Sequence, residues 1–374
     1  MKISKKDALS WFEFFAQLPE DEDLMPGQME IALSAFAQIE RAVNAHHTKL
    51  MAQIPHLKTL QGRTYYVGDD SKFPGGCKSC LLGTGLSAVR KTNKCDARCK
   101  FCYDYGALND QPPVGEGMWE IGGTKFYEED LPLLLSIHQK PTGISYVYLE
   151  PFMEIEKYYG TVKIFHEAGI HQHLYTNGIH ANRENLKFLA EAGLDEIRFN
   201  LGASHCADQV IENMAIAREY FPMVGIETPM TPEFYEEFFR KKEKILAVGL
   251  DFINCAELHL NENNIDNFAG ENLYFCRQGY ISPIFSRNLT LQFMKIADEE
   301  AWPLLVHDCS NRTKFARDLN LRAKEGGWFG QSSWGCEFAK IPFAYFLPVL
   351  RDESFLFLEE EPMPAGFGMG DIVL

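Results

Sequence analysis

Three cysteines in the string CDARCKFCYDYG, namely Cys95, Cys99 and Cys102, have the spacing of a metal-binding loop. Thiolates spaced as C-x-x-x-C-x-x-C can hold three irons of a four-iron cluster, which leaves the fourth iron free to bind another molecule. A closed zinc site is the competing interpretation, and it would need a fourth ligand from elsewhere in the chain. The triplet therefore predicts a metal centre with one open position.

Phe101, directly before the third cysteine, adds an aromatic residue to this pattern. With it, the segment resembles the radical S-adenosylmethionine (radical SAM) superfamily. The resemblance implies a [4Fe-4S] cluster, bound S-adenosyl-L-methionine, and an external one-electron reductant of the flavodoxin or ferredoxin type. It also implies reductive cleavage of S-adenosylmethionine to a 5′-deoxyadenosyl radical, which abstracts hydrogen from a substrate.

The composition limits the partners and the compartment. The 374 residues carry a formal net charge of −16, which argues against a protein that grips extended nucleic acid through a basic surface. No apolar run is long enough to span a membrane and no signal peptide is recognisable, so we expect a cytoplasmic protein. Ten cysteines in that compartment suggest metal ligands, catalytic thiols or buried small side chains. The cluster hypothesis implies an anaerobic, oxygen-poor cell.

The pattern of apolar residues predicts an α/β protein. Helical spacing dominates the start of the chain, and we assign residues 1–62 to an N-terminal helical addition. A glycine-rich segment at 71–85, read as a loop, carries Cys77 and Cys80. Strand-like and helical runs then alternate, which predicts parallel strands joined by helices. Together with the resemblance, this gives a partial (β/α)6-type barrel over 63–310, followed by a C-terminal extension over 311–374.

The second barrel strand ends in Tyr148-Leu149-Glu150-Pro151, where the superfamily usually has Gly-Gly-Glu-Pro. Glu150 and Pro151 match that motif, and the two glycines do not. Glu150 is accordingly our candidate for binding the amino group of S-adenosylmethionine. A glutamate that only caps the following helix is the alternative.

Further candidates for the cofactor follow the next strands, whose carboxyl ends meet on one side of a barrel. Asn177 could contact the cofactor or serve only as a turn residue. Arg198 could bind the methionine carboxylate or pair with a carboxylate inside the barrel. The remaining candidates are Asn200 for the ribose, Ser204, and Glu227 for ribose or substrate.

Glu257, His259 and Asn261 alternate along the sixth strand and should face one side. Three polar residues on one strand face require solvent or a polar lumen. We assign them as catalytic candidates on the substrate side. For His259, a buried histidine with ordinary partners is the alternative.

A second metal centre is predicted from Cys77 and Cys80, a C-x-x-C half-site that needs further ligands. Cys309 is the third proposed ligand, and His307 or Cys336 completes the set. Zinc, rubredoxin-type iron and a second iron–sulfur cluster all remain open as its metal. The alternative is that Cys309 and Cys336 are buried thiols.

Taken over residues 65–325, the C-x-x-C, the triplet and the H-x-C-S string resemble archaeal-type proteins related to pyruvate formate-lyase activating enzyme. The chain departs from that group at Tyr103-Asp104-Tyr105, where a proline-rich continuation is expected. The resemblance implies a radical SAM oxidoreductase or transferase that acts on a protein, a peptide or a small molecule. A non-catalytic iron–sulfur or zinc protein is the rival interpretation.

Overall fold

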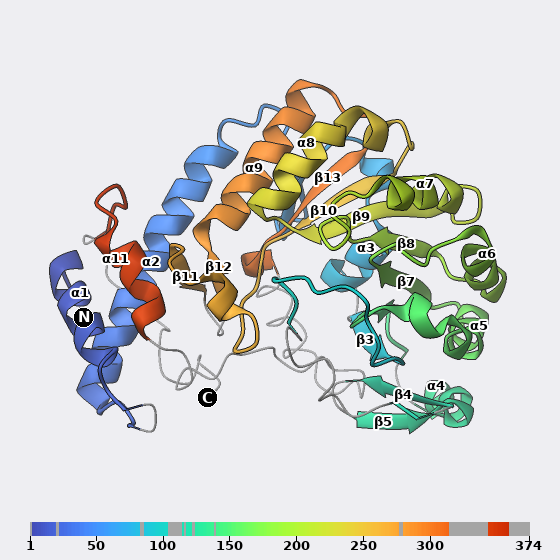
Figure 1. Cartoon of the computed structure of the whole chain (residues 1–374), viewed down its shortest axis with the longest axis horizontal. Coiled ribbons are helices and arrows are strands. Elements are labelled where there is room, and N and C mark those ends of the chain that lie inside the picture. Colours follow the sequence, from blue (N-terminus) through green and yellow to red (C-terminus); the bar gives the residue numbers. More distant parts are fainter. Residues whose placement is uncertain are drawn as a thin grey trace.

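The computed structural model describes residues 2–19, 22–82, 86–103, 114–115, 117–121, 124–137, 140–276, 280–313 and 343–358. Within these residues, the largest feature is an eleven-stranded sheet in the order β1-β2-β13-β10-β9-β8-β7-β6-β3-β4-β5 (Figure 1). Its middle consists of parallel strands: β3 (Leu86–Arg90), β6 (Gly143–Tyr146), β7 (His171–Thr176), β8 (Glu196–Phe199), β9 (Met223–Pro229), β10 (Phe252–Ala256) and β13 (Leu305–Cys309).

Antiparallel strands extend the sheet at both sides. They are β1 (Lys58–Leu60) and β2 (Thr64–Val67) beside β13, and β4 (Met118–Ile121) and β5 (Thr124–Tyr127) beside β3. Among the described residues β1 and β5 do not pair, so the sheet stays open. The predicted α/β partial barrel is confirmed, and β13 adds a parallel strand to the six expected.

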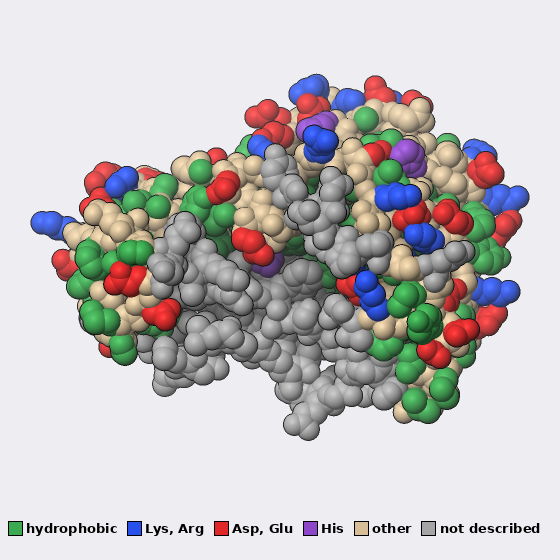
Figure 2. Space-filling model, turned by 60° about the horizontal axis from the view of Figure 1, so that its bottom comes forward, with side chains coloured by type: hydrophobic (Ala, Val, Ile, Leu, Met, Phe, Trp, Pro, Cys, Tyr) green, Lys and Arg blue, Asp and Glu red, His purple; other side chains and the backbone are tan. Residues whose placement is uncertain are grey.

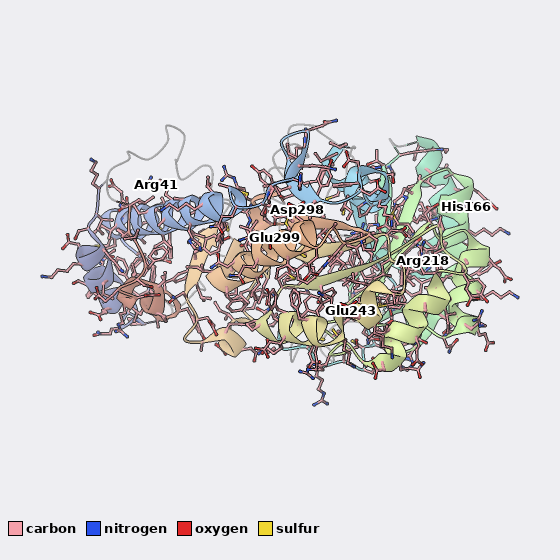
Figure 3. All side chains as sticks on the ribbon, turned by 90° about the horizontal axis from the view of Figure 1, so that it is seen from above. Arg41, His166, Arg218, Glu243, Asp298 and Glu299 are labelled. Carbon is pink, nitrogen blue, oxygen red and sulfur yellow. The ribbon has the colours of Figure 1, made fainter. Side chains whose placement is uncertain are left out.

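Helices cover the outer side of the curved sheet and follow the chain order of the strands (Figure 1). They are α5 (Tyr159–Glu167), α6 (Arg183–Ala192), α7 (Asp208–Ala217), α8 (Pro232–Leu246) and α9 (Ile284–Glu299). Seen from above, His166 of α5 lies at one side of the molecule and Arg41 of helix α2 (Pro26–Met51) lies toward the other (Figure 3). The main core lies between this layer and the sheet. Leu174, Ile197 and Ile253 of the parallel strands are fully buried in this core. Apolar residues are expected where helices cover a parallel sheet.

A second hydrophobic core joins the two ends of the chain. Helices α1 (Lys5–Phe15) and α2 (Pro26–Met51) pack with the hairpin of β11 (Leu273–Cys276) and β12 (Tyr280–Pro283). The turn η7 (Phe343–Phe346) and α11 (Leu347–Arg351) complete it. Both N-terminal helices lie within residues 1–62, the segment in which helical spacing predicts helices, and β1 also falls in that segment. The shorter elements are η1 (Asp70–Lys72), η2 (Glu128–Asp130), α4 (Leu131–Ile137), η3 (Pro151–Lys157) and η4 (Ile265–Phe268).

The loop predicted around Cys77 and Cys80 is wrong, because Gly75–Leu82 forms the helix α3. This helix packs with Phe252 and Leu305, the first residues of β10 and β13. It therefore closes the amino end of the barrel. The glycines permit this packing. A Cβ on Gly76 would lie 2.3 Å from Nδ1 of His173 and 2.5 Å from Nη2 of Arg198.

We predict that Gly76→Ala lowers the free energy of unfolding. Overpacking against two buried side chains costs about 1–3 kcal/mol, which exceeds the helix-propensity gain of about 1 kcal/mol. The matched control is Gly27→Ala in α2, where an added Cβ would meet nothing within 4 Å. Urea titration should show loss of stability for Gly76→Ala and none for Gly27→Ala. Equal stability of the two variants would contradict the close packing of α3.

Candidate functional site

The cysteine loop follows β3 and has no regular secondary structure. Its three thiols are half-buried, and the amide of Cys102 donates to the carbonyl of Cys99 at 2.9 Å. Burial raises the pKa of Cys95 to about 11 and that of Cys99 to about 12, and the neighbouring Cys102 thiol adds to both. Thiols with such pKa values stay protonated unless a cation stabilises the thiolates. This donor set therefore fits a bound metal centre.

Asp96 anchors the first half of the loop to the end of β7. The Asn177 side chain donates from Nδ2 to Oδ1 of Asp96 at 2.9 Å, and His180 Nε2 lies 2.8 Å from Oδ2. Asn177 was expected either as a cofactor contact or as a turn residue, and its Oδ1 also accepts from the amide of Ile179. Asn177 thus links the turn after β7 to the cysteine loop.

Four asparagines after β10 anchor the second half of the loop. Each donates from its side-chain nitrogen to a backbone carbonyl of the loop: Asn267 to Lys100 at 2.7 Å, Asn264 to Phe101 at 3.1 Å, and Asn261 and Asn263 to Tyr103 at 3.1 and 2.6 Å. The amide of Asn261, expected on the substrate side, is thus engaged with the loop. Sequence reasoning missed the other three, although the string NENNIDN is rich in hydrogen-bonding side chains that suit irregular backbone.

Glu150 is fully buried beside the loop and bonds to the end of β7 and to the start of η3. Its carboxylate accepts from Oγ1 of Thr176 at 2.8 Å, from the amide of Asn177 at 2.6 Å and from the amide of Phe152 at 3.1 Å. The last bond caps η3, as the alternative interpretation held. Burial raises the pKa of Glu150 to about 7, against the lowering effect of these bonds. A cationic partner would offset the free-energy cost of burying the ionised carboxylate. The Glu150 carboxyl is therefore suited to bind an ammonium group.

The two residues before Glu150 adopt the backbone that glycine favours. Tyr148 and Leu149 have φ of 70° and 59°, in the left-handed region. Side chains with Cβ adopt this region at a cost of about 1–2 kcal/mol each. The chain thus keeps a glycine-type turn at the position where the superfamily motif has two glycines.

Phe101 and Asn200 lie together over the ends of β8 and β9. A Cβ on Gly202 would be 3.5 Å from the Phe101 ring and 3.4 Å from Oδ1 of Asn200. Asn200 Oδ1 also accepts from Oγ1 of Thr228 at 2.8 Å. Ser204, in the same turn, donates to the carbonyl of Leu201 at 3.3 Å. The structure therefore brings Phe101, Asn200 and Ser204 to one end of the barrel.

Arg198 and Glu227 lie deeper in the lumen and bond to each other. The guanidinium bonds Oε2 of Glu227, donates from Nε to Glu196 at 2.5 Å, and is 2% exposed. Tyr175 donates from its hydroxyl to Glu227 at 3.1 Å. Arg198 is thus placed between two carboxylates, which is the ion pair within the barrel that the sequence left open.

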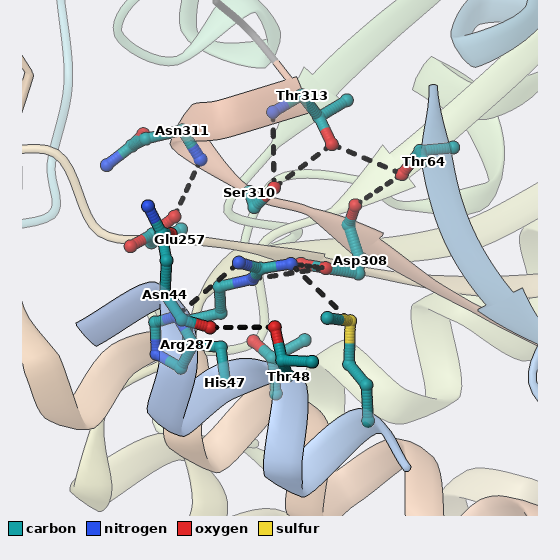
Figure 4. A network of polar contacts seen from close by, with 12 residues as sticks. Asn44, His47, Thr48, Thr64, Glu257, Arg287, Asp308, Ser310, Asn311 and Thr313 are labelled. Atoms are coloured by element: carbon teal, nitrogen blue, oxygen red, sulfur yellow. Dashed lines mark hydrogen bonds and ion pairs between the residues drawn. The ribbon is translucent and has the colours of Figure 1, made fainter. Parts of the chain in front are cut away.

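Glu257 bonds to residues outside the cysteine loop. Its carboxylate bonds the hydroxyl of Tyr274 and accepts from the amide of Asn311 at 2.6 Å. Figure 4 shows it beside the buried pair of Arg287 and Asp308, whose Nη2 and Oδ2 are 2.9 Å apart. These contacts give Glu257 a role in joining the end of β13 to the second core.

His259 lies next to the cysteine loop. Its ring packs edge-on against the ring of Tyr103, with centroids 5.1 Å apart, and is nearly buried. The carbonyl of His259 accepts from Nδ2 of Asn264 at 3.3 Å. The prediction that Glu257, His259 and Asn261 alternate along the sixth strand is wrong, because β10 ends at Ala256 and all three follow it. Among them, His259 is the one whose ring packs against the loop.

The structure brings some of the second metal set together. Burial raises the pKa of Cys77 well above its usual range, and the Cys309 thiol is close enough to add to this effect. Cys80 follows three residues later on α3 and is half-buried. His307 is engaged elsewhere, with Nδ1 2.6 Å from Asn254 Oδ1 and Nε2 2.9 Å from Thr64 Oγ1. Cys336 lies outside the described residues.

Comparison with known proteins agrees with the motif. Residues 89–245 match the family model of the radical SAM superfamily. A putative glycyl-radical enzyme activating enzyme from Methanocaldococcus jannaschii is 28% identical over 202 residues, which are 52% of this chain and 52% of that protein. The chain thus matches about half the length of this curated relative.

The chain is also weakly similar to solved structures. SuiB of Streptococcus suis bound to S-adenosylmethionine is 12% identical, with a TM-score of 0.41 over 60% of this chain and 50% of that one. Methylornithine synthase (PylB) is 10% identical, with a TM-score of 0.40 over 76% and 83%. On the cysteine motif and the family match, residues 89–245 form a radical SAM domain. Proteins of this superfamily use a [4Fe-4S] cluster and S-adenosylmethionine.

The buried Glu150 predicts a pH-dependent stability in the iron-free chain. Its folded pKa of about 7 lies above the ordinary glutamate value of 4.5, so between these pH values the folded state holds a proton that the unfolded state has lost. The contribution of Glu150 to the free energy of unfolding is fully present below pH 4.5 and is lost as pH rises through about 7. Each unit of difference between the folded and unfolded pKa corresponds to about 1.4 kcal/mol. Glu150→Gln should flatten this decline, measured by urea titration between pH 5 and 8. The exposed Glu167→Gln should keep the wild-type slope, and an unchanged slope in Glu150→Gln would contradict the assignment.

Proposed function

We propose that Cys95, Cys99 and Cys102 hold a [4Fe-4S] cluster with which the chain cleaves S-adenosylmethionine reductively and abstracts hydrogen from a substrate. The observation that carries this proposal is the set of hydrogen bonds that fix the cysteine loop. They come from the turn after β7 on one side and from the asparagines after β10 on the other. An exposed loop without such bonds would not hold three thiols in a fixed arrangement. When bound and reduced by an external flavodoxin or ferredoxin, the cluster supplies the electron that breaks the sulfonium bond.

The protein's own residues position the reactants and exclude water. Glu150 receives the ammonium group of S-adenosylmethionine, since its buried carboxyl gains from a cation. Asn200 lies at the strand end where it would bond the ribose, and Phe101 packs beside it. His259 and the nearby Tyr103 border the substrate side. We assign Arg198 and Glu227 to support of the lumen rather than to direct cofactor contact, because each is already bonded to the other.

We further propose that the substrate is a glycyl residue of a partner protein, ahead of a free peptide or a small metabolite. The matched relative from Methanocaldococcus jannaschii, a putative glycyl-radical enzyme activating enzyme, supports this choice. The proposal includes an oxidoreductase that works in the cytoplasm of an oxygen-poor cell. Helices long and apolar enough to cross a bilayer do not occur in the described part of the chain.

Extended nucleic acid remains a disfavoured partner. Among the described residues on the face in Figure 2, Lys and Arg side chains are interspersed with Asp and Glu and do not form a continuous basic surface. Together with the net charge of −16, this arrangement supports a protein or small-molecule partner.

A cysteine variant series tests the cluster and the cleavage reaction. After anaerobic reconstitution with iron and sulfide, the wild type should form 5′-deoxyadenosine from S-adenosylmethionine and dithionite. Cys95→Ala, Cys99→Ala and Cys102→Ala should each lose at least 100-fold of this activity together with the cluster absorbance, because a site with two thiolates cannot hold the cluster open at one iron. Cys206→Ala, in the apolar core, is the matched control and should retain both. Wild-type protein that binds iron and forms no 5′-deoxyadenosine would instead support an electron carrier.

The glycyl substrate has its own test. The reconstituted chain, S-adenosylmethionine and dithionite are mixed with a glycyl-radical enzyme of the same organism, and the mixture is frozen for electron paramagnetic resonance. We expect the doublet of a glycyl radical, and deuterium from α-deuterated glycine in the partner should appear in 5′-deoxyadenosine. Deuterium transfer from a peptide or metabolite, with none from the protein partner, would contradict the substrate class and leave the cleavage reaction intact.

A further inference from the structure

A cluster of metal-ligating side chains lies at the amino end of the barrel, opposite the cysteine triplet. His171 and His173 are the first and third residues of β7 and therefore face the same side, and Glu196 begins the neighbouring β8. One ligand atom from each of the three lies within 4.8 Å of the other two. His171 Nε2 is 3.3 Å from Oε2 of Glu196.

His173 supplies an independent reason to expect a ligand here. Its side chain is 0% exposed, and neither ring nitrogen has a hydrogen-bond partner among the described residues. Burial and the nearby Arg198 guanidinium lower the pKa of His173 well below its usual range. A buried imidazole without a hydrogen-bond partner can present a ring nitrogen to a cation. Buried polar groups in native proteins normally have a partner, and an unmatched one calls for an ion or a water.

The surroundings of Glu196 resemble the outer partners that orient metal ligands. Its Oε1 accepts from Nε of Arg198 at 2.5 Å, and its Oε2 accepts from the amide of Gly76 at 3.1 Å. His171 has its Nδ1 3.9 Å from a carboxylate oxygen of Asp195. Arg198 and Gly76 thus fix the carboxylate of Glu196, and Asp195 lies beside the imidazole of His171. Oε2 of Glu196 and Nε2 of His171 lie close to each other.

Helix α3 leaves room at this point because its first two residues are glycines. A Cβ on Gly75 would lie 2.5 Å from the His171 ring, and one on Gly76 would lie 2.3 Å from the His173 ring. Two carboxylates, those of Glu196 and Glu227, flank the one guanidinium of Arg198, and this excess of carboxylates favours a cation.

We propose that His171, His173 and Glu196 bind a divalent transition-metal ion, with zinc as the ion we commit to. Two imidazoles and one carboxylate form a donor set that zinc accepts, with a further position open to water. The ion would join β7 and β8 beneath α3 and stabilise the floor of the barrel. This site shares no ligand with the cysteine triplet, and it differs from the Cys77 and Cys309 site proposed above.

Zinc binding to the reconstituted full-length protein tests the proposal. The protein is treated with a mild chelator, supplied with one to two equivalents of zinc sulfate, desalted, and assayed for zinc by mass spectrometry. We expect about one zinc per chain, a higher melting temperature with zinc, and an absorption-edge spectrum with nitrogen or oxygen neighbours at about 2.0–2.1 Å. His171→Gln and His173→Gln should each lower zinc retention at least tenfold. His171 is partly exposed, so its variant should fold even if the His173 variant does not.

Cys77→Ala and Cys309→Ala are the matched controls, because they remove the other proposed site. Both should retain zinc at the wild-type level. The proposal is overturned if the wild type retains no zinc and shows no shift in melting temperature, since His173 would then bind water. Sulfur neighbours at about 2.3 Å, with zinc lost in the cysteine variants and kept in both histidine variants, would equally overturn it.

Discussion

The hydrogen bonds that hold the cysteine loop are the constraint on which the site depends. The loop has no helix or strand of its own, so its shape must come from outside. Asn177 and His180 bind Asp96 on one side, and the asparagines after β10 bind three loop carbonyls on the other. Each such bond contributes only about 1 kcal/mol, but together they tie the triplet to two strand ends of a rigid barrel.

The barrel keeps its polar groups in layers, each with a different task. At the carboxyl ends, Glu150 and Asn200 lie beside the cysteine loop. Below them, Arg198 is paired with Glu196 and Glu227 inside the lumen. A pair of this kind is costly to bury, and removing one partner leaves an uncompensated charge. The ion pairs of Arg198 with Glu196 and Glu227 therefore hold β8 and β9 together below the site. Helix α3 closes the amino end of the barrel.

The sequence allowed the class and the main site to be predicted because their signals are local. Cys95, Cys99 and Cys102 lie within eight residues, and the alternation of strands and helices is periodic. The bond between Asn264 and the Phe101 carbonyl joins residues 163 positions apart, which no local pattern reveals. The helix at Gly75–Leu82 was missed since its glycines suggest a loop until the histidines behind them are seen. The sequence left open whether Glu150 caps the following helix or lies at the cofactor site. In the structure its carboxylate caps η3 and also lies beside the cysteine loop.

The central claim is that the clamped triplet leaves one iron open for S-adenosylmethionine. Electron paramagnetic resonance of the dithionite-reduced cluster, recorded with and without S-adenosylmethionine, tests it most directly. Binding at the open iron predicts a change in the g-values on addition of S-adenosylmethionine, and hyperfine coupling when its amino nitrogen or carboxylate carbon is isotopically labelled. A spectrum that does not change, with no coupling from the label, would mean that a fourth protein ligand closes the cluster and would contradict the account.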